Sequence, residues 1–213
     1  MRKLLMKEIR LSSHPLSFVF VLFSFLFLVP GYPVLCAPFF VTLGLFQSFQ
    51  KARENGDILF SVLLPVPKRD CVRGKYSFVC LIEISAFVLM AAVSVVRAVF
   101  LRDSEVYLSN PMMNANGFAL ALVLVIFALF NRMFVSGFFR TAYGLGLPFL
   151  KYAVTAFLAV SFGETVHHLP GCMWFDDYSG LQFILLAAGC ILYTVITVLS
   201  YRGSVRRFER LDL

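Results

Sequence analysis

Six long apolar stretches alternate with shorter polar segments along the 213 residues of this chain. A helix that crosses the hydrocarbon core of a membrane needs about 20 mostly apolar residues. The pattern predicts six spans, at residues 16–29, 34–49, 77–96, 116–134, 143–162 and 181–201. The predicted fold is therefore an all-α integral membrane protein, with residues 1–213 forming a single transmembrane domain.

The polar segments also have recognisable patterns. In residues 1–15, apolar side chains recur at helical spacing opposite Arg2, Lys3, Lys7, Glu8 and Arg10, which predicts an amphipathic helix in the membrane interface. Residues 50–75 are the largest predicted cytoplasmic element. Within them the pattern favours a helix over residues 52–64 that ends at a proline. Residues 202–213 are predicted to be a cytoplasmic tail.

The segment before the last span, residues 163–180, is too short to cross a membrane and too apolar for a free loop. One interpretation is a re-entrant outer loop covered by protein. The other is interfacial anchoring by Trp174, Phe175 and Tyr178.

Positive charge distinguishes the two sides of the predicted bundle. Lys and Arg gather in alternate gaps, and short basic loops stay on the cytoplasmic side during insertion, so both termini are predicted to be cytoplasmic. The formal net charge of +7 is explained by this orientation and by contact with anionic membrane lipid, so we predict no nucleic-acid partner. A hydrophobic share of 60% leaves no room for a soluble catalytic domain.

The chain carries no P-loop, so energy from ATP would have to come from another subunit. Metal-capable side chains occur in the last outer loop, but their spacing does not force them to converge. They are Glu164, His167, His168, Asp176 and Asp177. A polar interfacial rim is the favoured interpretation, and we predict no metal, cofactor or catalytic residue in this chain.

Glu83 is the exception to an otherwise apolar interior. It lies about seven residues into the third span, roughly 10 Å deep at the helical rise. A carboxylate at that depth needs a partner or water. It is either a proton-coupling site or a structural group satisfied by Lys75, Lys151 or a nearby serine.

Residues 54–75 carry the strongest motif. A Glu and a Gly precede an apolar run that ends Leu-Leu-x-x-Pro, and an Arg and then Gly-Lys follow, with prolines at both positions 65 and 67. This pattern resembles membrane subunits of the second class of ABC exporters (type V fold), with one proline displaced by a residue. Chain size and the N-terminal opening are most similar to small bacterial permeases, such as those that export phenol-soluble-modulin peptides.

The resemblance implies a permease in the bacterial plasma membrane, paired with a second copy or a similar permease and with cytoplasmic ABC ATPase subunits that bind ATP and Mg²⁺. It also implies a set of ATPase-contacting residues between spans two and three, namely Glu54, Gly56, Asp57, Leu63, Leu64 and Arg69. The expected cargo is an amphipathic peptide or another apolar compound. Two alternatives remain: an ion-coupled carrier that uses Glu83, and a non-transporting immunity protein that binds a toxin peptide.

Overall fold

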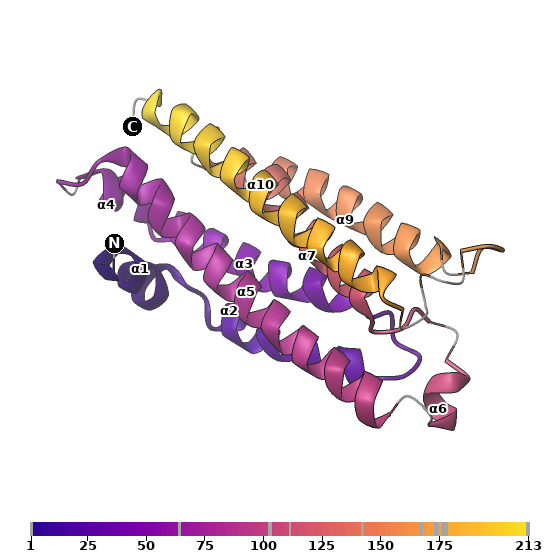
Figure 1. The fold of residues 1–213 in the computed structure, drawn as a ribbon. Coiled ribbons are helices and arrows are strands. Elements are labelled where there is room, and N and C mark those ends of the chain that lie inside the picture. Colours follow the sequence, from indigo (N-terminus) through magenta and orange to yellow (C-terminus); the bar gives the residue numbers. More distant parts are fainter. Residues whose placement is uncertain are drawn as a thin grey trace.

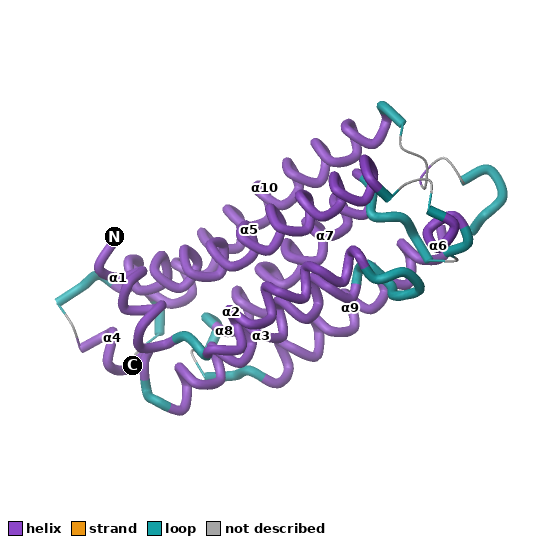
Figure 2. Tube along the Cα trace, turned by 90° about the horizontal axis from the view of Figure 1, so that it is seen from below, coloured by secondary structure: helices purple, strands orange, loops and turns teal. Residues whose placement is uncertain are grey.

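The computed structural model describes residues 2–63, 65–101, 104–110, 112–141, 143–166, 168–172, 175 and 179–211, and the described residues form helices and connecting turns without a strand. The long helices run side by side in one elongated bundle (Figures 1 and 2). The N and C termini lie at the same end of the bundle as α4, and α6 lies at the opposite end (Figure 1). The helical elements are α1 (Arg2–Lys7), η1 (Glu8–Ser12), α2 (Pro15–Val19), η2 (Phe20–Leu28), α3 (Cys36–Glu54), α4 (Asp57–Leu63), α5 (Lys68–Phe100), α6 (Glu105–Leu108), α7 (Gly117–Leu129), η3 (Phe130–Val135), α8 (Ser136–Phe138), α9 (Gly146–Val166) and α10 (Leu181–Glu209).

Four of the described helices are long and apolar enough to cross a membrane: Lys68–Phe100, Gly117–Phe138, Gly146–Val166 and Leu181–Glu209. A fifth candidate arises if Lys3–Ser12 and Pro15–Leu28, which are bent by 104°, are taken as one span. Helix α3 is not among these candidates, because its second half carries Gln47, Gln50, Lys51 and Arg53. The number of six spans therefore stays a prediction.

The segment formed by α2 and η2 covers a long distance with few residues. Pro15 occupies the first turn of α2, where a missing N–H costs no hydrogen bond, and His14 caps that turn by accepting from the Leu16 backbone N–H at 3.2 Å. The next nine residues, η2, form a 3₁₀-helix, which rises about 2.0 Å per residue instead of about 1.5 Å. Residues 15–28 consequently extend over about 26 Å, where an α-helix of that length would reach only about 21 Å.

Helix α7 and its continuation form the centre of the bundle. Of the apolar window in Gly117–Phe138, 78% is buried within the chain, against 17% for Gly146–Val166 and 11% for Leu181–Glu209. Helix α10 packs along α7, and a side chain on Gly189 would come within 2.9 Å of the Ala121 Cα. Close approach through small residues is the usual way in which membrane helices gain packing contact.

Two sequence-based expectations need correction here. The helix predicted over residues 52–64 is broken in two, because Asn55 ends α3 and Gly56 adopts a left-handed φ of +63° before α4 begins. The amphipathic pattern placed Lys7 and Glu8 on the polar faces of an interfacial helix, but their side chains are only 12% and 4% exposed. Glu8 as a whole residue is only 3% exposed, because it is ion-paired with Lys7 of α1 and with Lys75 of α5. At the other end of the chain, residues 202–209 of the predicted tail continue α10.

Candidate functional site

Helix α4 has one buried face and one exposed apolar face. Asp57, Ile58 and Ser61 are 7%, 4% and 4% exposed, and their spacing places them on the same side of the helix. Leu59, Phe60 and Leu63 are 45%, 52% and 84% exposed. Their spacing is also one, three and four residues, so they share the opposite side. A short helix thus presents an apolar surface outward while its polar groups face the bundle.

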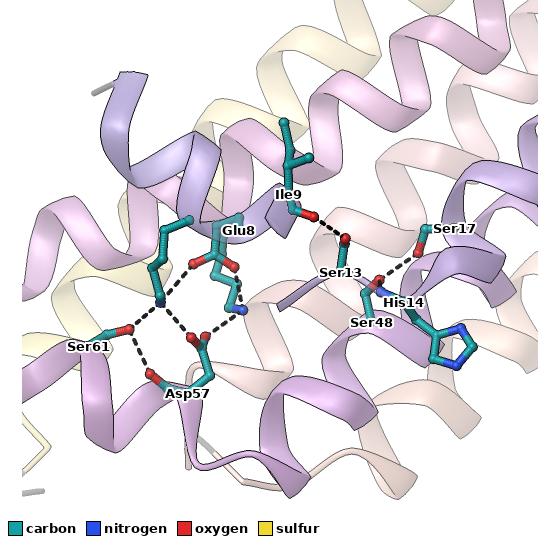
Figure 3. A network of polar contacts seen from close by, with 10 residues as sticks. Glu8, Ile9, Ser13, His14, Ser17, Ser48, Asp57 and Ser61 are labelled. Atoms are coloured by element: carbon teal, nitrogen blue, oxygen red, sulfur yellow. Dashed lines mark hydrogen bonds and ion pairs between the residues drawn. The ribbon is translucent and has the colours of Figure 1, made fainter. Parts of the chain in front are cut away.

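The buried face of α4 rests on a cluster of four charged side chains, which we call the ionic cluster: Lys7, Glu8, Asp57 and Lys75. Each ammonium group contacts both carboxylates (Figure 3). Lys7 Nζ lies 2.6 Å from Asp57 Oδ1 and 3.2 Å from Glu8 Oε1. Lys75 Nζ lies 2.8 Å from Asp57 Oδ2 and also contacts Glu8 Oε2.

The ionic cluster is nearly dry. The side chains of the four residues are between 4% and 12% exposed. Buried charges are tolerated when they are paired and hydrogen-bonded, and here two positive and two negative groups sum to zero. Because its members come from the α1–η1 segment, α4 and α5, the cluster joins the N-terminal segment to two helices that begin about 50 residues later or more.

Local hydrogen bonds complete the cluster around Asp57. Lys7 Nζ donates to Ser61 Oγ, and Ser61 Oγ donates to the Asp57 carbonyl at 2.7 Å (Figure 3). Burial by itself would raise the pKa of the Asp57 carboxyl. The ammonium groups of Lys75 and Lys7 outweigh this effect and lower that pKa below its ordinary value. Asp57 is therefore charged at neutral pH.

A second set of hydrogen bonds fixes the bend after η1. The His14 backbone N–H donates to Ser48 Oγ at 2.7 Å, and Ser17 Oγ lies 2.6 Å from the same oxygen (Figure 3). Ser17 also donates to the Gly44 carbonyl at 2.6 Å, and Lys51 Nζ donates to the Ser13 carbonyl at 2.8 Å. The N-terminal segment is thus held to α3 at the bend and to α4 and α5 through the ionic cluster.

The structure separates the predicted ATPase-contacting residues into three places. Glu54 is exposed at the end of α3, in a groove lined also by His14 and Lys51. Arg69 is exposed in the first turn of α5, in another groove beside Tyr201 and Glu209. Asp57 faces inward to the ionic cluster, and only Leu63 of the predicted set lies on the exposed apolar face of α4. Leu64 lies outside the described residues.

Sequence reasoning missed three members of the ionic cluster, Lys7, Glu8 and Lys75, as site residues. A signal was present, because Asp57 directly precedes the apolar run that begins at Ile58, and a carboxylate buried with that run would need a cation. The position of that cation depends on folding, since Lys7 is 50 residues away.

Glu83 is also held differently from the prediction. It is fully buried, and its Oε2 accepts hydrogen bonds from Tyr193 Oη at 2.8 Å and from Asn131 Nδ2 at 2.9 Å. Neither of the lysines that the sequence suggested is its partner: Lys75 belongs to the ionic cluster and Lys151 is exposed. The other oxygen, Oε1, has no hydrogen-bond partner among the described residues. Asn131 lies in the π-helical turn η3, a distortion that is common at functional positions in helices.

The outer loop carries no assembled metal site in the part of the chain that the structure describes, where no three His, Cys, Asp or Glu side chains converge. His167, Trp174, Asp176, Asp177 and Tyr178, which the sequence analysis singled out there, lie outside the described residues. Phe175 is described, and its ring packs on Phe118 with centroids 4.6 Å apart.

The comparison with known families decides the class of this molecule. Residues 3–209 match the family described as ABC-2 family transporter protein. The chain belongs to this ABC-2 family. Neither the curated proteins nor the solved structures contain a match to this chain.

Membership makes this ABC-2 protein a multi-pass membrane subunit of an ABC transporter. Proteins of this family typically work with an ATPase subunit and are generally not catalytic themselves. The two-faced helix α4 and the ionic cluster behind it are thus features of a transport component, and α4 lies at the same end of the bundle as the two termini (Figure 1).

Proposed function

We propose that this ABC-2 protein is the permease of an ATP-driven exporter of amphipathic peptides or other apolar compounds, and that its ATPase subunit docks on the exposed face of α4. ATP and Mg²⁺ would be bound by that partner. Movement of α4 on ATP binding would pass through the ionic cluster to α5 and the N-terminal segment, and would rock the helices between inward and outward access.

One observation carries this proposal: α4 is apolar on the outside and ion-paired on the inside. Leu59, Phe60 and Leu63 form a compact exposed patch that only a membrane surface or another protein can cover. Behind it, the cluster carboxylate of Asp57 binds α4 to Lys75 of the long helix α5. A contact made on the patch would therefore displace α5 rather than a free loop.

The positions of the chain ends support six spans with both termini in the cytoplasm. Both ends lie at one end of the bundle, which requires an even number of crossings (Figure 1). Five candidate spans together with α3, which is 19 residues long and packs on α2, η2 and α5, make six. The basic residues near this end favour its cytoplasmic location.

The exposed helices support a second copy in the complex. Only 17% of the apolar window of α9 and 11% of that of α10 are buried within the chain. These flanks face lipid or protein, and we propose that a second permease covers part of them and that the export pathway lies between the two copies. Basic and acidic residues are nearly absent from the predicted spans, with Glu83, Arg132 and Lys151 as the exceptions, and this supports an apolar cargo.

One observation supports the ion-coupled alternative: Oε1 of Glu83 is buried and has no hydrogen-bond partner among the described residues. Membership of an ABC transporter family weighs against it. Transport that stops when the proton gradient is collapsed at constant ATP would favour the carrier.

The test uses tagged permease and the P-loop ATPases encoded in the same genome. Leu63→Asp should place a charge in the centre of the docking patch and reduce capture of the cognate ATPase at least tenfold, because a buried unpaired charge is costly. Leu108→Asp is the matched control, since Leu108 is 72% exposed on α6 at the opposite end of the bundle. Equal capture by parent and both variants would exclude α4 as the docking element.

A further inference from the structure

A cavity with basic walls lies between the ends of η3, α8, α9 and α10, and none of the four ionic-cluster residues lines it. It has a volume of about 680 Å³, within the range of sites for small molecules. Four cationic side chains line it, namely Arg132, Arg140, Lys151 and Arg207. None of the described residues that line the cavity is acidic.

One of these cations is fixed in place by the bundle. The Arg207 guanidinium donates from Nη1 to the Ser136 carbonyl at 3.3 Å and to Ser136 Oγ at 3.2 Å. Ser136 itself is fully buried. The packing beneath is tight, because a side chain on Gly137 would come within 2.8 Å of the Pro148 Cβ. The cavity is therefore a built feature of the helix packing.

The charge of the cavity favours an anionic ligand. Four like charges around one concave site raise each other's energy and focus a positive potential into it. Guanidinium groups bind phosphate oxygens through paired, charge-assisted hydrogen bonds, and an ammonium adds a point charge. A phosphate group is the ligand that this arrangement fits best.

The apolar surroundings indicate where that phosphate comes from. Leu147 lines the cavity and begins an exposed stripe on α9 that continues through Leu150, Val154 and Phe157 at helical spacing. These four side chains are 64%, 60%, 53% and 69% exposed. A phospholipid would place its headgroup among the cations and its acyl chains along the stripe.

We propose that this cavity binds the phosphate headgroup of an anionic phospholipid, at the level where α9 and α10 leave the membrane. Basic pockets between membrane helices on the cytoplasmic side are suited to such headgroups. The lipid would hold the ends of α8, α9 and α10 together without crossing to α4. The proposal depends on the proposed function only for the leaflet, which the orientation of the bundle would make cytoplasmic.

Native mass spectrometry of the purified permease tests the site, with phosphatidylglycerol and phosphatidylcholine as the probes. The parent should retain phosphatidylglycerol preferentially. Arg132→Gln combined with Lys151→Gln should weaken its binding about thirtyfold, since each basic residue near an anionic surface contributes about a factor of five. Arg202→Gln combined with Arg206→Gln is the matched control, because these arginines line a different groove on α10, and it should change binding less than threefold.

A variant that keeps the charges separates lipid recognition from folding. Arg132→Lys combined with Lys151→Arg should keep the phosphatidylglycerol preference. Three outcomes would overturn the proposal. One is equal weakening by the pocket and control pairs. Another is occupancy by inorganic phosphate at millimolar concentration with no preference between the two lipids, which would make the ligand a soluble anion. The third is unchanged lipid binding with lost ATPase capture, which would make the cavity a protein contact.

Discussion

Neutralising Asp57 should unbalance the ionic cluster and loosen α4 from the bundle. Asp57→Asn keeps the size of the side chain but leaves Lys7 and Lys75 facing Glu8 alone. The cluster then carries a net positive charge in a site where the side chains are at most 12% exposed. Breaking a buried ion pair by removing one partner costs about 3–5 kcal/mol, because the remaining charge is desolvated without compensation.

A double-mutant cycle isolates the interaction. In Asp57→Asn combined with Lys75→Met, the remaining Lys7 and Glu8 again sum to zero charge, and their contact of 3.2 Å is kept. The loss of unfolding free energy in the double variant should be smaller than the sum of the two single losses by at least about 2 kcal/mol. A coupling energy of this size is within the range for residues in one ionic network. Glu105→Gln is the control for loss of an exposed carboxylate, which should change stability by no more than about 0.5 kcal/mol.

The measurement is the free energy of unfolding in mixed micelles, followed by ATPase activity of the reconstituted complex. If the cluster transmits movement of α4, the double variant should recover stability while its ATP hydrolysis stays uncoupled from transport. Additive losses in the cycle would refute the reasoning, since they would mean that Asp57 and Lys75 do not act as partners. Full recovery of coupled transport would show that the cluster only stabilises the fold.

Three further predictions follow from other features. The pKa of Asp57 is lower in the folded state than in the unfolded state, so ionised Asp57 stabilises the fold. This contribution should be complete above about pH 4 and should decline as the pH falls below that value. In unfolding experiments, Asp57→Asn should flatten this decline. Glu83→Ala should lower the free energy of unfolding by about 1–3 kcal/mol for each of the two donors that lose their acceptor, Tyr193 and Asn131. Glu83→Gln keeps an acceptor oxygen, so its stability should stay within about 1 kcal/mol of the parent. Equal losses in the two variants would contradict hydrogen bonding as the role of Glu83. The topology can be tested in a variant without the five native cysteines. Tyr32→Cys should react with an impermeant thiol reagent from outside intact cells, and Arg69→Cys should not. The reverse pattern would show that the orientation is opposite to the predicted one.

Much of the helix content followed from the sequence. Apolar stretches of spanning length must satisfy their backbone groups internally when they lie in lipid, and a helix is the local way to do so. Local chemistry also marked some boundaries, as Pro15 does at the start of α2. Where polar residues entered, as in the second half of α3, composition alone became ambiguous about a span.

The 3₁₀ conformation of η2 could not be read from the sequence. Its nine residues are apolar except Ser24, so they contain no periodicity that distinguishes one helix type from another. The helix predicted over residues 52–64 ran across Gly56, where the backbone turns at φ +63°. The Asn55-Gly56 pair is a turn signal that could have marked this break.

Only the tertiary structure decided which polar groups meet. Lys7 meets Asp57 across 50 residues of chain, and Glu83 finds its partners on η3 and α10 rather than in Lys75 or Lys151. Sequence establishes that a charge in an apolar setting needs a partner, because desolvation is costly. The identity of the partner depends on how the helices pack side by side and rotate about their axes, and that arrangement is a property of the whole bundle.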